Sequence, residues 1–253
     1  MRLIRKLETD GESLFRGRSY LPLVILPFAV LAVFEAAPVD ALLGDGAEQL
    51  WLYLCLFISA TGIAIRAFTV GFVPSGTSGR TTSAPRADSL NTTGMYSIVR
   101  NPLYLGNFIV YLGIALATKS WWFVLLVSLV YWLYIERIIA AEEAYLAAKF
   151  GEVFERWTAG TPIFVPRPAA WQKTDARFSL RTVFRREYPG VMASAAGFLA
   201  LRAIEELIVE GVSVRDWLAK DCVVIAVFAA AVIVFLVLRT LKKRTRFLHV
   251  PGR

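Results

Sequence analysis

The sequence predicts an all-α protein, a polytopic membrane bundle of about six transmembrane helices with both termini in the cytoplasm. Hydrophobic residues make up 57% of the 253 residues, whereas about half or less is usual in a soluble domain. Apolar residues also come in runs of roughly 16 to 21, close to the length at which a helix crosses hydrocarbon. These runs do not alternate with polar residues as membrane barrel strands do. Helices are therefore expected, because each satisfies its own backbone hydrogen bonds.

The apolar runs and the basic residues together give the predicted topology. The runs lie near residues 21–37, 50–67, 103–118, 121–138, 190–210 and 221–238. Lysine and arginine gather in the N-terminus, the loop 68–102, the stretch 139–189 and the C-terminal tail. Because basic loops stay on the cytoplasmic side of a membrane, both termini and these two connecting segments are expected there.

Three regions are predicted along the chain. Residues 1–90 would form two spans and a cytoplasmic loop, residues 91–168 a helical hairpin with an interfacial helix, and residues 169–253 a basic segment with two further spans. A run of apolar residues at helical spacing predicts the interfacial helix. Its members are Leu146, Phe150, Val153, Phe154 and Trp157.

The loop from Gly71 to Thr93 is rich in glycine, serine, threonine and proline and has little that would pack in a core. A loop of this length without secondary structure is typical of either a disordered segment or a functional lid. Both interpretations stay open. The lid is favoured because the loop runs directly into the polar motif described below.

The charge and the rare residue types limit the function classes. The net charge is +8, but the basic residues lie between apolar runs, which favours anionic lipid head groups over nucleic acid. Cys55 and Cys222 fall in predicted spans and His249 is the single histidine, so no disulfide, metal site or histidine-based triad is expected. The acidic residues near the N-terminus and the lack of a small-residue cleavage site also argue against a cleaved signal peptide.

The polar residues most suggestive of chemistry lie between Gly94 and Gly106 and at Glu142-Glu143. Pro102 fits the first turn of a helix, so Arg100 and Asn101 are expected at the N-terminal end of the third span. The helix dipole there favours an anionic ligand. The two carboxylates follow one helical hairpin later and are expected to face this motif.

These residues resemble a known family. The pattern Gly-x-Tyr-x-x-Val-Arg-Asn-Pro-x-Tyr-x-Gly, then an apolar hairpin, Glu-Glu and Phe-Gly-x-x-Phe, is similar to the integral-membrane methyltransferases that include isoprenylcysteine carboxyl methyltransferase and phospholipid N-methyltransferases. The resemblance covers residues 92–166. Asn101 stands where the family usually has histidine, and it can donate and accept hydrogen bonds but cannot gain charge. The plan of the whole chain also resembles bacterial lipid A 1-phosphate methyltransferase-like members.

The resemblance implies S-adenosylmethionine as the cofactor. Arg100 would bind its carboxylate, and Glu142 or Glu143 its ammonium or ribose hydroxyls. Tyr96 or Tyr104 would stack on its adenine or approach its sulfonium. The implied cofactor-binding residues are Tyr96, Arg100, Asn101, Pro102, Tyr104, Gly106, Glu142 and Glu143. The implied catalytic residues are Arg100, Asn101, Tyr104 and Glu143.

The methyl acceptor is expected to be an acidic group on a lipid at the cytoplasmic face, where nearby arginines would hold it. A carboxylate or phosphate is a nucleophile at neutral pH, whereas an ethanolamine nitrogen must first lose a proton. The candidate substrate-binding residues are Arg16, Arg18, Arg177, Arg181 and Arg185. The last three recur every four positions and would share one helical face, either as a membrane anchor or as a platform for an anionic substrate.

Several alternatives stay open at this stage. The acceptor could be a lipid phosphate, an isoprenylcysteine carboxylate or the amine of phosphatidylethanolamine, and a non-enzymatic lipid-binding or transport protein is the second function class. A bacterial inner membrane is the expected location. Arg202, with Glu205 and Glu206 one helical turn later, is either a functional charge or a self-satisfied structural pair.

Overall fold

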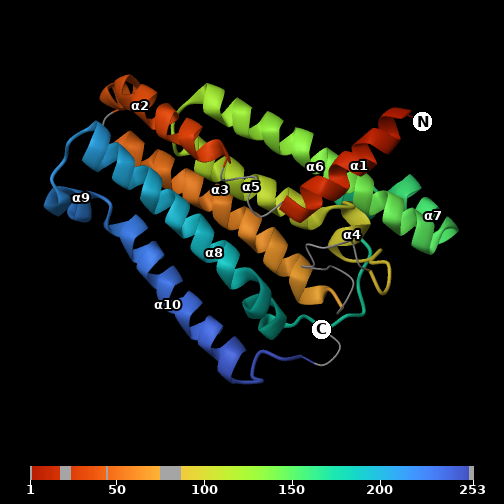
Figure 1. Cartoon of the computed structure of the whole chain (residues 1–253). Coiled ribbons are helices and arrows are strands. Elements are labelled where there is room, and N and C mark those ends of the chain that lie inside the picture. Colours follow the sequence, from red (N-terminus) through yellow and green to blue (C-terminus); the bar gives the residue numbers. More distant parts are fainter. Residues whose placement is uncertain (1, 18–23, 44, 75–86, 251–253) are drawn as a thin grey trace.

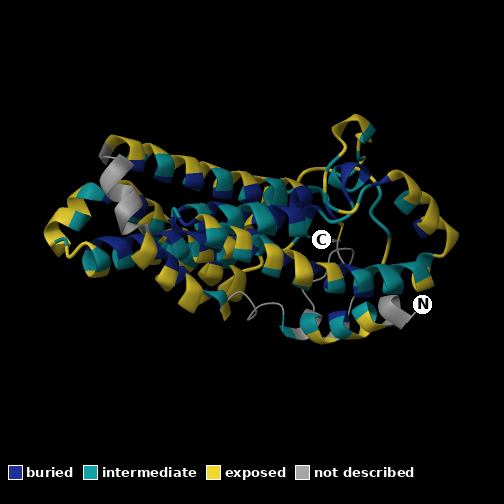
Figure 2. Cartoon of the chain, turned by 90° about the horizontal axis from the view of Figure 1, so that it is seen from above, coloured by how far each residue is buried: buried dark blue, intermediate teal, exposed yellow. Residues whose placement is uncertain are grey.

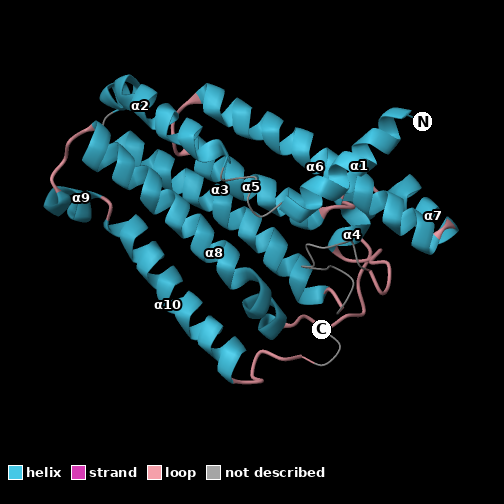
Figure 3. Cartoon of the chain, in the orientation of Figure 1, coloured by secondary structure: helices cyan, strands magenta, loops and turns pink. Residues whose placement is uncertain are grey.

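The computed structural model describes residues 2–17, 24–43, 45–74 and 87–250, and within these ranges every regular element is helical (Figure 1; Figure 3). The predicted all-α fold class is confirmed. The α-helices are α1 (Arg2–Gly17), α2 (Leu26–Leu43), α3 (Asp45–Phe72), α4 (Met95–Ile98), α5 (Pro102–Leu116), α6 (Trp121–Phe150), α7 (Glu152–Gly160), α8 (Leu180–Ala203), α9 (Val214–Lys220) and α10 (Cys222–Arg244). A π-helix (Ile204–Val209) prolongs α8, and a 3₁₀ turn spans Pro168–Ala170.

Three of the six predicted spans form helices that are long and apolar enough to cross a membrane, namely Gly46–Phe72, Trp121–Phe150 and Cys222–Arg244. The first and third predicted spans form shorter apolar helices, Leu26–Glu35 and Pro102–Leu116. The fifth differs most from its predicted range of 190–210. It begins ten residues earlier, at Leu180, so its first turns carry the basic residues that the sequence placed in a loop.

The predicted interfacial helix is wrong as a single element. The α6 helix runs on to Phe150, and Gly151 with φ 52° ends it before α7 begins at Glu152. A positive φ cannot be continued within a right-handed helix. Leu146 therefore belongs to the long helix, whereas Trp157 belongs to the short helix that follows.

The predicted loop and N-terminal region also change in the structure. The α3 helix continues through Phe72, so the first two residues of the predicted loop, Gly71 and Phe72, are helical. Residues 75–86 of the proposed lid lie outside the described part of the chain. The unanticipated α1 packs along α6, where Leu14 joins an apolar cluster of that helix. Asp10 of α1 lies 4.0 Å from Arg137 of α6.

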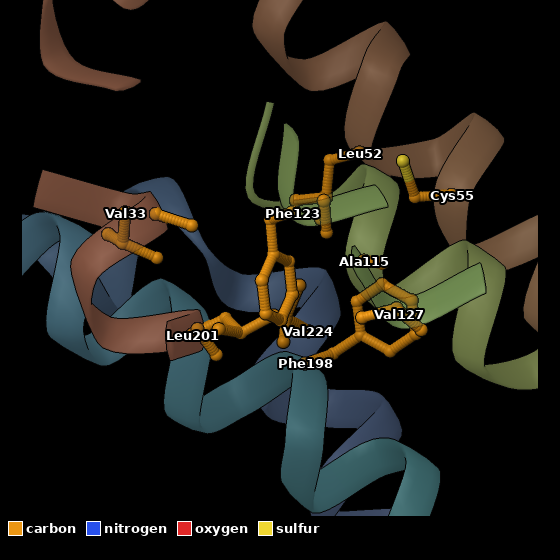
Figure 4. Close-up of a cluster of buried hydrophobic side chains, with 12 residues drawn as sticks. Val33, Leu52, Cys55, Ala115, Phe123, Val127, Phe198, Leu201 and Val224 are labelled. Atoms are coloured by element: carbon orange, nitrogen blue, oxygen red, sulfur yellow. The ribbon is translucent and has the colours of Figure 1, made fainter. Parts of the chain in front are cut away.

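An apolar core joins the helices that lie far apart in the sequence (Figure 4). Phe123 of α6 and Phe198 of α8 are its largest side chains, 3% and 2% exposed. They pack among Val33, Leu52 and Val224 from α2, α3 and α10. Since both C-terminal helices contribute to this core, the segment after residue 168 is part of the same bundle. Cys55 is buried and Cys222 exposed, and both are free thiols.

The α3 and α5 helices approach each other closely because small residues line their contact. A Cβ atom on Gly106 would lie 2.8 Å from the carbonyl oxygen of Gly62 and 2.5 Å from Cγ of Arg66. The second contact explains how the long side chain of Arg66 can cross the face of α5. Gly106 thus allows α3 and α5 to approach closely, and its implied role in cofactor binding stays a prediction.

A buried charge cluster closes the end of the bundle at which α9 lies, opposite α4 (Figure 1). Arg202 binds Glu205 and Glu206 on its own helix, as the spacing predicts. It also binds two carboxylates that were not predicted as its partners, Glu48 of α3 and Asp221 before α10. The cluster gains two further cations, Lys119 and Lys220.

Candidate active site

An ion pair between Arg100 and Glu143 lies at the centre of the candidate site, near α4. The guanidinium Nη1 donates to the carboxylate at 3.3 Å, and both side chains are mostly buried, at 12% and 26% exposure. Arg100 precedes α5 and Glu143 lies late in α6, so the helical hairpin returns the carboxylate to the start of α5. The predicted meeting of the two motifs is confirmed.

The chain segment that carries Arg100 is fastened to the segment after α7. The backbone N–H of Arg100 donates to the carbonyl oxygen of Pro162 at 2.9 Å, and that of Arg167 donates to Ile98 at 2.9 Å. The indole of Trp157 donates to the carbonyl oxygen of Tyr96 at 2.9 Å. These bonds hold a short, mostly irregular segment in place, so the side chains of the motif are fixed by backbone contacts.

Two residues of the motif set its local backbone. Gly94 adopts φ 61°, a conformation that favours glycine, at the turn before α4. Pro102 is the first residue of α5, with Asn101 as the residue before it. Arg100 therefore lies next to the N-terminal end of the helix, as the sequence predicts.

Asn101, which stands where the resembled family usually has histidine, is hydrogen-bonded to the segment that follows α7. Its amide Nδ2 donates to the carbonyl oxygen of Ile163 at 3.2 Å. The side chain thus holds the 161–167 segment against the start of α5. Among the described residues its Oδ1 accepts no hydrogen bond, which leaves that oxygen as the group through which Asn101 could contact a ligand.

Tyr96 and Glu142 form a second polar group beside the ion pair. Burial is the main cause that raises the pKa of Tyr96 to about 12, with the Glu142 carboxylate raising it further and Arg186 and Arg66 acting in the opposite direction. The two adjacent carboxylates of α6 therefore have different neighbours. Glu143 pairs with Arg100, and Glu142 lies in the electrostatic environment of Tyr96.

A cavity of about 190 Å³ adjoins this group. Its lining combines the end of α3 with the residues that lead into α4, including Phe72, Asn91, Gly94 and Tyr96. The cavity is thus partly aromatic and partly lined by a polar loop. Such a combination suits an aromatic ligand that also carries hydrogen-bonding groups.

Tyr104 lies in the first turn of α5 and packs against α6. Its ring contacts an apolar cluster that contains Tyr131 and Ile135, and its carbonyl oxygen accepts a hydrogen bond from the Tyr131 hydroxyl at 2.6 Å. The position is compatible with a packing role. The catalytic role that the family resemblance implies for Tyr104 stays a prediction.

The candidate substrate arginines do not form one surface. Arg177 precedes α8, which begins at Leu180, so the predicted face of three guanidinium groups is wrong for this residue. The reason is that Ser179 caps the helix, accepting a hydrogen bond from the Thr182 N–H. Arg181 and Arg185 do lie one turn apart on α8. Arg18 and the side chain of Arg16 lie outside the described part of the structure.

Sequence reasoning missed Arg66, although it is a charge within an apolar run. Its guanidinium binds Glu187 of α8 through two hydrogen bonds of 2.8 and 3.1 Å and donates to Oδ1 of Asn107 at 2.6 Å. A lone arginine in a predicted span is a signal of a buried polar network. Its partner could not be predicted from a local pattern, because Glu187 lies 121 residues later in the sequence.

The helical fold and this arginine–carboxylate centre define an integral-membrane protein with a polar site at one end of its bundle. Residues 50–153 match the profile of the phospholipid methyltransferase family. This segment runs from α3 into α7 and contains the motifs that resemble the integral-membrane methyltransferases.

Three curated relatives share parts of this segment. The chain is 39% identical over 77 residues to protein-S-isoprenylcysteine O-methyltransferase of Schizosaccharomyces pombe, covering 30% of this chain and 33% of the relative. It is 30% identical over 124 residues to the cobalt-zinc-cadmium resistance protein CzcN of Cupriavidus metallidurans, covering 49% and 55%. It is 34% identical over 85 residues to the nickel-cobalt-cadmium resistance protein NccN of Alcaligenes xylosoxydans xylosoxydans, covering 34% and 39%.

The chain thus spans from a third to slightly over half the length of these curated relatives. No solved structure matches it significantly. Within the described ranges, no group of three or more His, Cys, Asp or Glu side chains is arranged to hold a metal ion.

Proposed function

We propose that this chain is a membrane methyltransferase that uses S-adenosylmethionine and methylates an acidic group carried by a lipid. One observation carries the proposal most directly. In the part of the chain that the structure describes, Nε of Arg100 and Oε1 of Glu143 are buried without a hydrogen-bond partner. One is a donor and the other an acceptor, and they belong to the same ion pair.

These two atoms fit the amino-acid end of the cofactor. Leaving a buried polar group unsatisfied costs about 1 to 3 kcal/mol, so a ligand that satisfies both atoms gains from their placement. The Arg100 N–H can donate to a carboxylate, and the Glu143 oxygen can accept from an ammonium group. S-adenosylmethionine carries both groups and, when bound, supplies a methyl group from its sulfonium.

Tyr96 and the cavity beside it are the proposed place for the purine ring. The phenol offers an aromatic face, and the loop around Asn91 offers backbone hydrogen-bonding groups. Because its pKa is raised to about 12, Tyr96 keeps its proton at physiological pH. It can therefore donate a hydrogen bond but does not act as a base there.

The neutral tyrosine favours an acidic acceptor over an amine. A phosphate or carboxylate is already ionised at neutral pH, so the protein has to position it and exclude water. An amine has to lose a proton, and Glu143, one of the two carboxylates of the site, is paired with Arg100. The fission yeast relative, named an O-methyltransferase of isoprenylcysteine, supports the same acceptor class.

We place this chemistry at the cytoplasmic face of a bacterial inner membrane. The basic end of α10, with Lys242, Lys243 and Arg244, and the basic start of α8 lie toward the end of the bundle that holds α4 (Figure 1). The excess of positive charge on the cytoplasmic side of membrane proteins supports this orientation.

Methyl transfer to defined lipids tests the proposal. The purified chain would be reconstituted with methyl-labelled S-adenosylmethionine and one acceptor at a time: a lipid phosphomonoester, a prenylated cysteine or phosphatidylethanolamine. We expect label in an acidic acceptor and at least about a tenfold lower rate for Glu143→Gln, with Glu152→Gln on exposed α7 as the control. Label in the amine alone would replace O-methylation by N-methylation, and no label in any lipid would refute the enzyme.

A further inference from the structure

A basic pocket lies between α8 and the C-terminal tail, outside the segment that matches the family. It has a volume of about 500 Å³. Its lining residues are Arg185, Lys242, Thr245, Arg246, Leu248 and His249. Of these described residues three are permanent cations and none is acidic, so the pocket concentrates positive charge.

The tail that forms one wall is folded and anchored. After α10 ends, the N–H of Phe247 donates to the Thr245 hydroxyl at 3.2 Å, and the N–H of His249 donates to the carbonyl oxygen of Arg246 at 2.9 Å. Leu248 is only 2% exposed. The guanidinium of Arg181 lies 4.9 Å from the Phe247 ring centroid, which joins the tail to α8.

The position of the pocket points to a membrane surface. The α10 helix is a candidate span whose apolar window is only 17% buried inside the protein, so most of its surface is available to lipid. Exposed residues, yellow in Figure 2, lie along the outer sides of the helical bundle. Its last turn carries Lys242, Lys243 and Arg244. Basic residues at the end of a span lie at the level of lipid head groups. The pocket therefore opens where phosphate groups are concentrated.

We propose that this pocket binds a phosphate group, supplied by an anionic lipid head group or by free phosphate. Guanidinium groups match phosphate geometry and form paired hydrogen bonds with it, and lysine adds a point charge. The volume falls within the roughly 300 to 1,000 Å³ usual for ligand sites, which leaves room for a head group around the phosphate. The site is separate from the Arg100–Glu143 pair and does not depend on methyl transfer.

Binding of a short-chain phosphatidic acid to the full-length chain in neutral detergent tests this proposal. The pocket variant is Lys242→Gln/Arg246→Gln. The control is Lys243→Gln/Arg244→Gln, which removes the same charge from the same helix end at residues that do not line the pocket. We expect about tenfold weaker binding, about 1.4 kcal/mol, in the pocket variant and less than about a twofold change in the control.

Two further measurements identify the source of the phosphate and allow for a double variant that does not fold. Competition of phosphatidic acid by millimolar inorganic phosphate would assign the site to phosphate itself, and resistance to competition would assign it to a lipid head group. The single variant Arg246→Gln, at an exposed position, repeats the test if the double variant does not fold. Equal weakening in the pocket and control variants, or no binding by the wild type, would overturn the proposal.

Discussion

Arg66 of α3 and Glu187 of α8 form a two-pronged ion pair, with Nε to Oε2 at 2.8 Å and Nη2 to Oε1 at 3.1 Å. Arg66 lies in the segment that matches the methyltransferase family, and Glu187 lies beyond it. The pair therefore fastens the C-terminal helices to the family core beside the candidate site. The charge of Arg186, the neighbour of Glu187, also acts on the Tyr96 phenol and opposes the rise in its pKa.

Breaking this pair on one side is expected to destabilise the protein strongly. Arg66→Met leaves the Glu187 carboxylate, whose side chain is 6% exposed, without its cation, at a cost of about 3 kcal/mol. The double variant Arg66→Met/Glu187→Leu should regain part of this loss, because no charge is then left buried. Unfolding in detergent would measure both.

The control for these variants is Arg137→Met, which removes a looser ion pair with Asp10 at 4.0 Å. It should lower the free energy of unfolding by less than about 1 kcal/mol. The single variant Glu187→Leu completes the comparison. If the double variant instead lost as much free energy of unfolding as Arg66→Met and Glu187→Leu together, Arg66 and Glu187 would not be coupled.

The contact between α3 and α5 gives a second prediction. Gly106→Ala places a Cβ 2.5 Å from Cγ of Arg66 and 2.8 Å from the carbonyl oxygen of Gly62, so the helices have to separate. We expect a loss of about 1 to 3 kcal/mol in unfolding free energy. Gly190→Ala, in α8 with open space around it, is the matched control and should be neutral or slightly stabilising. Similar stability of the two variants would contradict the close approach.

The pKa of Tyr96 gives a prediction at alkaline pH. Its value in the folded state, about 12, exceeds the ordinary value of 10.0, mainly because of burial. The unfolded chain therefore loses the proton first, so the contribution of the neutral phenol is complete below pH 10 and is lost as the pH rises toward 12. Relative to Tyr96→Phe, the wild type should lose at most about 3 kcal/mol across this window. Parallel stability curves for the two proteins would refute the buried neutral phenol.

The charge cluster around Arg202 is expected to be structural. Arg202→Met would leave Glu206 and Asp221, both almost fully buried, without their main cation, at a cost of about 3 to 5 kcal/mol. Cofactor affinity of the folded fraction should stay within about twofold, because the cluster and Arg100 lie at opposite ends of α5. Arg215→Met at an exposed position is the control. A selective loss of cofactor binding would instead give the cluster a functional role.

Local patterns predicted much of the site. Pro102 marked the start of α5, and the length of the apolar hairpin was enough to bring Glu143 back to Arg100. Partners distant in sequence could not be predicted in this way, since neither Arg66 with Glu187 nor Arg202 with Glu48 leaves a periodic signal. The predicted ends of helices were also wrong where a single residue determines the end. The apolar pattern continues on both sides of Gly151, but this residue separates α6 from α7. Ser179 caps α8 and so leaves Arg177 outside that helix.

Calorimetric binding of S-adenosylmethionine to the detergent-purified chain tests the central claim most directly. We expect micromolar affinity for the wild type and at least about tenfold weaker binding, about 1.4 kcal/mol, for Arg100→Ala and for Glu143→Ala. Arg156→Ala and Glu152→Ala, exposed on α7, serve as matched controls and should bind as the wild type does. No binding by a folded wild type with lipid present, or equal affinity in all variants, would contradict a cofactor site at the Arg100–Glu143 pair.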